Sequence, residues 1–253
     1  MALFTGVGVA LVTLFSDDGD LRAKATGDLA AQLTELGVRA VLVNGTTGEA
    51  ATLSPEERDE VVGAVRAAVP ADVPVIAGTG AATGWRAAEL TERAFGSGAD
   101  AVLVLSPPGV PDPRRYYDRV AGRATGPVLA YHFPGASAPG IAVDLLPELP
   151  VAGLKDSSGD AARLLHEHEV FAGDLWTGAA SLLSLSGSIG AAGGLVAAAN
   201  TAPEECAAAF AGDGAAQVRV ASLDRAAAVD FPAGYKRATA ERFGVSPVTR
   251  VGS

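Results

Sequence analysis

Residues 151–159 read Val-Ala-Gly-Leu-Lys-Asp-Ser-Ser-Gly, a short apolar run that ends in charged and hydroxylated residues. Short apolar runs of this kind are typical of the buried strands of a parallel sheet. A longer amphipathic stretch follows, so the segment predicts a strand, a turn and a helix. The same alternation recurs from one end of the chain to the other, which indicates an α/β fold built from repeated βα units.

Eight apolar runs predict eight strands. We expect them at Gly6–Thr13, Ala40–Asn44, Val73–Gly78, Ala101–Ser106, Val128–His132, Ala152–Lys155, Phe171–Thr177 and Gly194–Ala198. An open doubly wound sheet usually needs fewer strands, so the expected architecture is a closed (β/α)8 TIM barrel. No Ser/Gly-rich linker divides the 253 residues. We therefore expect a single domain over residues 1–253, with the barrel over about 1–212 and a short C-terminal helical extension over about 213–253.

Capping residues predict where the helices begin. Thr26 is expected to cap a helix over Gly27–Leu36, and Ser54 with Glu57 has the pattern of a capping box. Further helix starts are expected at Thr83, Asp112-Pro113 and Thr201–Glu204, and two helices beyond the barrel at Gly214–Val229 and Pro232–Phe243.

Charge and cysteine content exclude several classes of protein. The formal net charge of −10 leaves no broad cationic surface for phosphates, so we expect no nucleic-acid partner. The single Cys206 can form neither an internal disulfide nor a thiol-based metal site, which fits a reducing, cytoplasmic location.

Two apolar stretches resemble export or membrane signals, but other features of each argue against that interpretation. The run Ala2–Phe15 has no basic residue before Arg22, so it lacks the charged start of a signal peptide and is better interpreted as a barrel strand. The uncharged run Leu175–Pro203 is interrupted by serines and glycines that suit tight packing better than contact with lipid. No membrane partner is therefore expected.

Lys155 is the first candidate for chemistry, because barrel enzymes carry their reacting groups at the C-terminal ends of the strands. It directly follows the apolar run Val151–Leu154, so its amine is expected within or just above the barrel interior. Desolvation there favours the neutral amine, which is a nucleophile. The alternative is a lysine that extends from the strand end to pair with Asp156 or Asp160.

Two other strand ends carry suitable polar groups. The loop Gly45–Gly48 offers the hydroxyls of Thr46 and Thr47 and successive backbone N–H groups, which together could bind a carboxylate. Tyr131 ends the strand before that of Lys155, where a phenol could transfer protons. Each feature alone could be an ordinary loop or a buried tyrosine. Together they supply the amine, anion site and proton shuttle that Schiff-base chemistry on a 2-oxo acid requires.

With these segments in this order, the sequence resembles the dihydrodipicolinate synthase and N-acetylneuraminate lyase superfamily of class I aldolases. The superfamily's G-T-T-G-E loop matches Gly45–Glu49, its Y-N-x-P segment matches Tyr131–Pro134, and its G-x-K-[DE]-x-[ST]-G segment matches Gly153–Gly159. The likeness covers nearly all of the barrel. It extends to Gly178 and to the segment Leu195–Asn200, which resemble positions whose backbone lines the keto-acid site.

The resemblance implies a role for each matching residue. Lys155 would form an imine with pyruvate, Tyr131 would donate and accept protons, and Thr46 and Thr47 would hold the keto-acid carboxylate with Gly48 beside them. The substrate site would also include Gly178, Leu195 and Ser137. Such chemistry implies no metal and no cofactor other than the covalent imine, and the partners would be pyruvate and an aldehyde.

Two departures from the pattern bear on the substrate. Dihydrodipicolinate synthases have a relay tyrosine after strand four, where this chain has Ser106-Pro107-Pro108-Gly109, and an arginine after the tyrosine segment, where it has Gly135-Ala136-Ser137. A substrate carboxylate without its cationic partner would lose affinity. The small residues instead resemble those of aldolases that cleave 2-keto-3-deoxy sugar acids. Only Arg114 and Arg115 could serve a phosphorylated sugar acid, and they are expected on a helix.

Two alternatives stay open: a 4-hydroxy-tetrahydrodipicolinate (dihydrodipicolinate) synthase in which another group replaces the arginine, and a keto-acid-binding barrel with impaired catalysis. His132 is expected to face away from the barrel interior. His166 and His168 are expected to diverge on a helix, so no metal site is predicted. By resemblance, a homo-oligomer, either a tetramer or a dimer, is expected.

Overall fold

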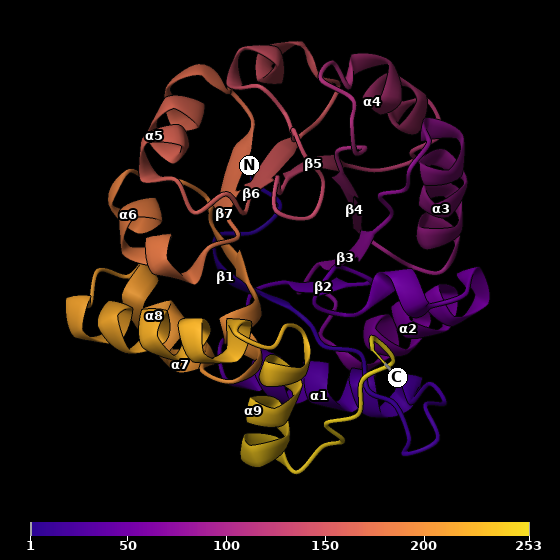
Figure 1. Ribbon diagram of the computed structural model, residues 1–253, viewed down its shortest axis with the longest axis vertical. Helices are drawn as coiled ribbons and strands as arrows, with labels where there is room; N and C mark the ends of the chain where they lie inside the picture. Colours follow the sequence, from indigo (N-terminus) through magenta and orange to yellow (C-terminus); the bar gives the residue numbers. More distant parts are fainter. Residues whose placement is uncertain (1, 253) are drawn as a thin grey trace.

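The computed structural model describes residues 2–252 and contains the closed barrel that the strand pattern predicts (Figure 1). Eight parallel strands follow one another around the barrel in sequence order, and the last pairs with the first. They are β1 Gly6–Ala10, β2 Val41–Val43, β3 Val75–Gly78, β4 Ala101–Leu105, β5 Val128–His132, β6 Gly153–Asp156, β7 Asp174–Thr177 and β8 Gly193–Val196. The (β/α)8 fold prediction is confirmed.

Helices surround the strands, and two more follow the barrel (Figure 1). The α-helices are α1 Ala23–Glu35, α2 Pro55–Ala68, α3 Gly84–Gly96, α4 Arg114–Ala121, α5 Ala161–Val170, α6 Leu183–Ser188, α7 Pro203–Phe210, α8 Gly214–Ala228 and α9 Ala233–Phe243. Short 3-10 turns lie at Ala50–Thr52, Val143–Glu148, Ala180–Leu182 and Ala197–Asn200. The predicted C-terminal helices are confirmed as α8 and α9. After α9 the chain returns to the start of α2, where Arg250 pairs with Glu57.

Two apolar clusters hold the barrel together, one on each face of the sheet. The larger cluster lies between the strands and the surrounding helices, and the smaller one fills the barrel interior. Phe4, just before β1, stacks on Trp176 in that interior with ring centroids 5.0 Å apart. The interior between the strands is therefore a packed core and not a pore.

The uncharged stretch from residue 175 to residue 203 forms β7, α6, β8 and the turns around them. Within residues 2–252, no helix has the length and apolar character needed to cross a membrane.

Several predicted element boundaries shift by one or two residues in the structure, and three shift by more. Thr26 does not cap α1, which begins at Ala23; its hydroxyl accepts from Leu14 N and donates to Arg22 O inside the helix. Strand β1 ends at residue 10 rather than 13, because Val12 N donates to the Asn200 side chain instead of a neighbouring strand. Strand β7 begins at residue 174 rather than 171. The capping box at α2 is confirmed.

Candidate active site

Adjacent strands bring Tyr131 and Lys155 together. The two residues are register partners between β5 and β6. Because side chains alternate along a strand, both point into the barrel while their neighbours Leu154 and His132 point outward. Lys155 Nζ lies 4.5 Å from the centroid of the Tyr131 ring. The amine and the phenol that the sequence singles out therefore share one side of the barrel mouth.

The Lys155 side chain is buried without a counter-ion. The residue is 4% exposed, and burial lowers the pKa of its amine from 10.5 to about 7. Among residues 2–252 it forms no ion pair with any carboxylate. Asp156 instead accepts from Ser158 N and Oγ, and Asp160 caps α5. The pairing of Lys155 with either aspartate, the alternative to a nucleophile, is thus not observed.

Gly178, directly after β7, leaves room for the lysine. A Cβ at this position would lie 2.8 Å from Lys155 Cε and 1.8 Å from Ser157 Oγ. Both distances are too short for non-bonded atoms. Any larger residue would displace the Lys155 and Ser157 side chains, so this arrangement requires glycine for space.

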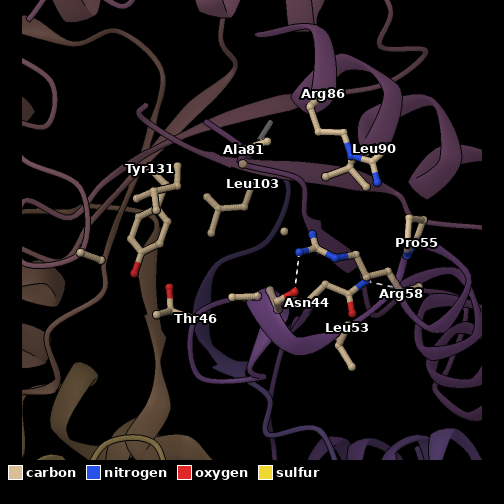
Figure 2. Close-up of a pocket in the computed structure, with 17 residues that line it drawn as sticks. Asn44, Thr46, Leu53, Pro55, Arg58, Ala81, Arg86, Leu90, Leu103 and Tyr131 are labelled. Atoms are coloured by element: carbon tan, nitrogen blue, oxygen red, sulfur yellow. Dashed lines mark hydrogen bonds between the residues drawn. The ribbon is translucent and has the colours of Figure 1, made fainter. Parts of the chain in front are cut away.

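Tyr131 is a buried, protonated phenol that contacts two hydroxyl groups. Burial raises its pKa to about 12, although hydroxyl contacts with Ser157 and Thr46 act in the opposite direction. Its ring stacks on Phe133 with centroids 5.9 Å apart. Figure 2 shows the Tyr131 hydroxyl directed toward Thr46. A short hydroxyl cluster thus joins the loop Gly45–Gly48 to the end of the lysine strand.

Ser157 is a site residue that sequence reasoning missed. It lies two positions after Lys155, and this spacing places its side chain on the same side as the lysine. The pattern was visible in the sequence, where Ser157 follows Lys155-Asp156. It did not show that the hydroxyl approaches Tyr131, because that contact joins two strands.

The loop Gly45–Gly48 folds into a tight turn with two unused donors. Gly48 N donates to Gly45 O at 3.1 Å and Glu49 N donates to Thr46 O at 3.1 Å. Within the described residues, the backbone N–H groups of Thr46 and Thr47 have no acceptor. These two groups can therefore bind a carboxylate. The N–H group of Gly48 itself closes the turn, so Gly48 lies beside these two donors.

Glu49 fixes this loop to the end of the chain. It has a left-handed φ of 55° and is buried against Lys236 of α9, which is also buried. Its Oε2 accepts from Arg250 N and Val251 N, both at 2.8 Å. The sequence did not predict this anchor, because Arg250 and Val251 follow Glu49 by about 200 residues.

Ser137 and Leu195 lie beside the site in structural positions. Ser137 Oγ donates to Ser106 O at 2.5 Å, so its proton is committed to the backbone. Ser137 also does not line the cavity described below, although its neighbour Ala136 does. Leu195 belongs to the apolar cluster of the barrel interior.

No tyrosine of α4 replaces the missing relay tyrosine. Tyr116 donates to Ala81 O and Tyr117 to Val104 O, each at 2.9 Å, so both hydroxyls hold the backbone. In this part of the described structure, Ser106 Oγ is buried and has no hydrogen-bond partner. The hydroxyl groups that contact Tyr131 in the described structure are therefore those of Thr46 and Ser157.

The histidines belong to the scaffold. His132 Nδ1 accepts from Ile141 N at 2.9 Å, and burial lowers its pKa to about 4. His166 and His168 lie on α5. Over residues 2–252, no three His, Cys, Asp or Glu side chains gather as a metal site would need.

A cavity of about 380 Å³ opens beside Tyr131 and Thr46. It extends across the ends of β3 and β4 to the helices α2 and α3 (Figure 2). Most of its wall is apolar, but Arg58 and Arg86 reach it from those helices. Neither arginine was predicted as a site residue.

Sequence comparison assigns the chain to a family. The sequence profile of the Dihydrodipicolinate synthetase family matches residues 3–228. A 4-hydroxy-tetrahydrodipicolinate synthase of Bartonella quintana is 31% identical over 94% of this chain and 88% of its own length. An uncharacterized DapA-like lyase of Halobacterium salinarum is 37% identical over 79% of this chain and 68% of its own.

Solved structures agree with this assignment. Dihydrodipicolinate synthase DapA-2 of Bacillus anthracis has a TM-score of 0.87 and 25% identity, covering 99% of this chain and 95% of that one. YagE of E. coli K12, a prophage protein of the dihydrodipicolinic acid synthase family solved in complex with pyruvate, has a TM-score of 0.90 and 26% identity, covering 100% and 93%. The chain therefore belongs to the dihydrodipicolinate synthetase family and is a carbon–carbon lyase.

Proposed function

We propose that this protein is a pyruvate-dependent class I aldolase that forms or cleaves a C–C bond between pyruvate and an aldehyde. The observation that carries the proposal is the buried Lys155 amine, which has a pKa of about 7 and no carboxylate partner among the described residues. Near neutral pH a substantial fraction of such an amine is neutral and nucleophilic. The relative YagE, solved with pyruvate, supports the choice of keto acid.

The proposed reaction begins with carboxylate binding. The backbone N–H groups of Thr46 and Thr47 receive the pyruvate carboxylate, and this places the keto carbon near Lys155 Nζ. The neutral amine attacks that carbon, and the keto oxygen leaves as water after taking protons through the Tyr131 hydroxyl. The product is a protonated imine, whose positive charge lies beside the bound carboxylate.

The imine then activates the methyl group of pyruvate. The cationic nitrogen withdraws electrons, so the adjacent carbon loses a proton and an enamine forms. In the synthetic direction the enamine carbon attacks the aldehyde carbon, and the new alkoxide takes a proton delivered through Tyr131. Water then attacks the imine carbon and releases the 4-hydroxy-2-oxo acid together with the free Lys155 amine. Cleavage follows the same steps in reverse, and no cofactor is needed beyond the covalent imine.

Borohydride trapping tests the imine. Incubation with pyruvate and borohydride should add about 72 Da to the protein, the mass of a reduced pyruvyl imine. The chain has only three lysines, so peptide mapping can assign the adduct without ambiguity. We expect it on Lys155 and not on exposed Lys24 or on buried, ion-paired Lys236. A Lys155→Met variant should show no adduct. No mass gain in the wild type, or a gain on another lysine, would contradict the proposal.

For the aldehyde partner, the small residue Ala136 in the cavity wall favours products of the 2-keto-3-deoxy acid type, and the sequence resemblance makes sugar acids the first members of this class to test. The second candidate is 4-hydroxy-tetrahydrodipicolinate synthase, which is favoured by the names of the relatives. Turnover of pyruvate with aspartate semialdehyde, compared with turnover of 2-keto-3-deoxy sugar acids, distinguishes the two. Turnover of the semialdehyde at a rate within about tenfold of the sugar acids would support the synthase.

A further inference from the structure

The cavity beside Tyr131 and Thr46 has walls unlike those of a sugar site. Apolar side chains form most of its surface, among them Leu53, Leu90 and Leu103. Each hydroxyl of a bound sugar that meets such a wall would lose its hydrogen bonds to water without replacement. The walls therefore suit a hydrocarbon chain or ring better than a polyhydroxylated one.

Arg58 brings a positive charge to the end of this cavity that lies away from Tyr131 (Figure 2). The first turn of α2 places it there, and its backbone carbonyl accepts from Asn44 Nδ2 at 3.0 Å. One guanidinium nitrogen donates to Ala50 O. Within residues 2–252 Arg58 forms no ion pair. Its remaining donors and its whole charge are therefore available to a ligand.

Arg86 of α3 lines the same end of the cavity. Its charge acts on Arg58: burial lowers the Arg58 pKa, and repulsion from Arg86 lowers it further. Arg86 also pairs with Glu89 at 2.6 Å, but its side chain is 43% exposed, so this pair is weak. Two like charges that face one cavity destabilise each other until an anion neutralises them. An anionic ligand group would accordingly bind best between the two guanidinium groups.

We infer that the aldehyde partner of this enzyme has an apolar body and a carboxylate or phosphate at its far end, which Arg58 and Arg86 bind. The inference rests on the proposed function, because the aldehyde carbon must reach an enamine on Lys155 near Tyr131. It narrows the proposed 2-keto-3-deoxy acid products to those of an acidic hydrocarbon aldehyde. It also gives a place to a substrate anion in a chain that lacks an arginine after the tyrosine segment.

Two matched aldehydes test the inference. 4-Carboxybenzaldehyde and 4-formylbenzamide have the same shape and an apolar ring, but only the first carries a charge. With pyruvate as donor, we expect kcat/KM to favour the acid by about tenfold or more, because a charged group gains paired hydrogen bonds from arginine. The Arg58→Gln variant should reduce this ratio to near one by lowering turnover of the acid alone. Arg58→Lys should retain part of the ratio.

Matched controls separate this effect from damage to the fold. Arg123→Gln removes an exposed arginine of the same charge, paired only with Glu92 in the described structure and outside the cavity, and should leave the ratio unchanged. Borohydride trapping with pyruvate should proceed equally in the wild type and in all these variants. A failure of trapping in the wild type refutes the proposed function, whereas normal trapping with an acid-to-amide ratio near one refutes only the present inference.

A binding measurement tests whether the two arginines bind an anionic group even if neither aldehyde is turned over. Protein carrying reduced pyruvate on Lys155 can be titrated calorimetrically with 4-methylbenzoate and 4-methylbenzamide. We expect the benzoate to bind at least about tenfold tighter in the wild type, and equally weakly in Arg58→Gln. Equal affinities in the wild type would overturn the inference. Tight binding of inorganic phosphate without any preference for the benzoate would also overturn it, because the arginines would then serve a separate anion.

Discussion

Replacing Gly178 with alanine should impair the proposed reaction of Lys155 with pyruvate while leaving the barrel folded. The added Cβ would lie 1.8 Å from Ser157 Oγ and 2.8 Å from Lys155 Cε. To regain ordinary contact, the serine hydroxyl must move by about 1.5 Å and the lysine side chain by about half that distance. A misplacement of about 1 Å can lower a rate about 100-fold. We therefore expect kcat/KM for pyruvate to fall by about two orders of magnitude, with about 1–3 kcal/mol of overpacking strain.

The assay measures the rate of the borohydride-trapped adduct together with the midpoint of urea unfolding. Gly96→Ala is the matched control, because a Cβ at that position, the last residue of α3, would meet no atom within 4 Å. It should leave the trapping rate unchanged and the unfolding midpoint equal or higher. The double variant Ser157→Gly, Gly178→Ala removes the closest contact and should recover part of the lost stability.

Two outcomes would contradict the role assigned to Gly178. Unchanged trapping in a folded Gly178→Ala variant would show that the lysine does not need the space beside this glycine. A loss of activity as large in Gly96→Ala would show that the assay responds to helix changes far from the site.

Three further predictions concern the proton shuttle, the pH dependence and the loop anchor. Tyr131→Phe keeps the ring but removes the hydroxyl, so overall turnover should fall by about 10²–10⁴; undiminished turnover would exclude Tyr131 as the shuttle. The trapping rate at saturating pyruvate should rise with pH from 5 and level off above about 7. The reason is that only the neutral Lys155 amine reacts, and burial lowers its pKa to about 7. A rate that still rises at pH 9 would contradict this prediction. Glu49→Gln leaves Lys236 buried without its ion pair, so the free energy of unfolding measured in urea should fall by about 3 kcal/mol. The control Asp28→Asn breaks the exposed pair with Lys24 and should hardly change the unfolding midpoint.

Local sequence patterns predicted the features that depend on a single segment. The apolar runs placed all eight strands, and the lysine at the end of β6 and the tyrosine at the end of β5 followed from strand-end positions. Ser54 and Glu57 predicted the start of α2 correctly, since a capping box involves only four consecutive residues. Thr26 misled because its hydroxyl bonds Leu14 N, outside the helix, and a capping pattern cannot reveal such a contact.

The remaining features depend on segments distant in sequence. Nothing in the sequence distinguished Arg58 from other helix residues, and only the fold shows that it lines the cavity beside Tyr131. The anchor of Glu49 joins the loop after β2 to Lys236 and to the end of the chain. The hydrogen bond from Ser137 to Ser106 O joins two loops. The sequence does not reveal this bond, so the Ser137 hydroxyl was predicted to be free for a substrate. Contacts of this kind are set by packing, which no local pattern contains.

The proposed mechanism requires Lys155 to present a neutral amine to a keto acid near pH 7. Labelling the three lysines with ¹³C at Cε gives three NMR signals, which variants of Lys24 and Lys236 assign. We predict that the Lys155 signal titrates with a midpoint near pH 7 and shifts to an imine position when pyruvate is added, while the other two signals do not respond to pyruvate. A Lys155 signal that stays protonated at pH 9 and ignores pyruvate would contradict the account.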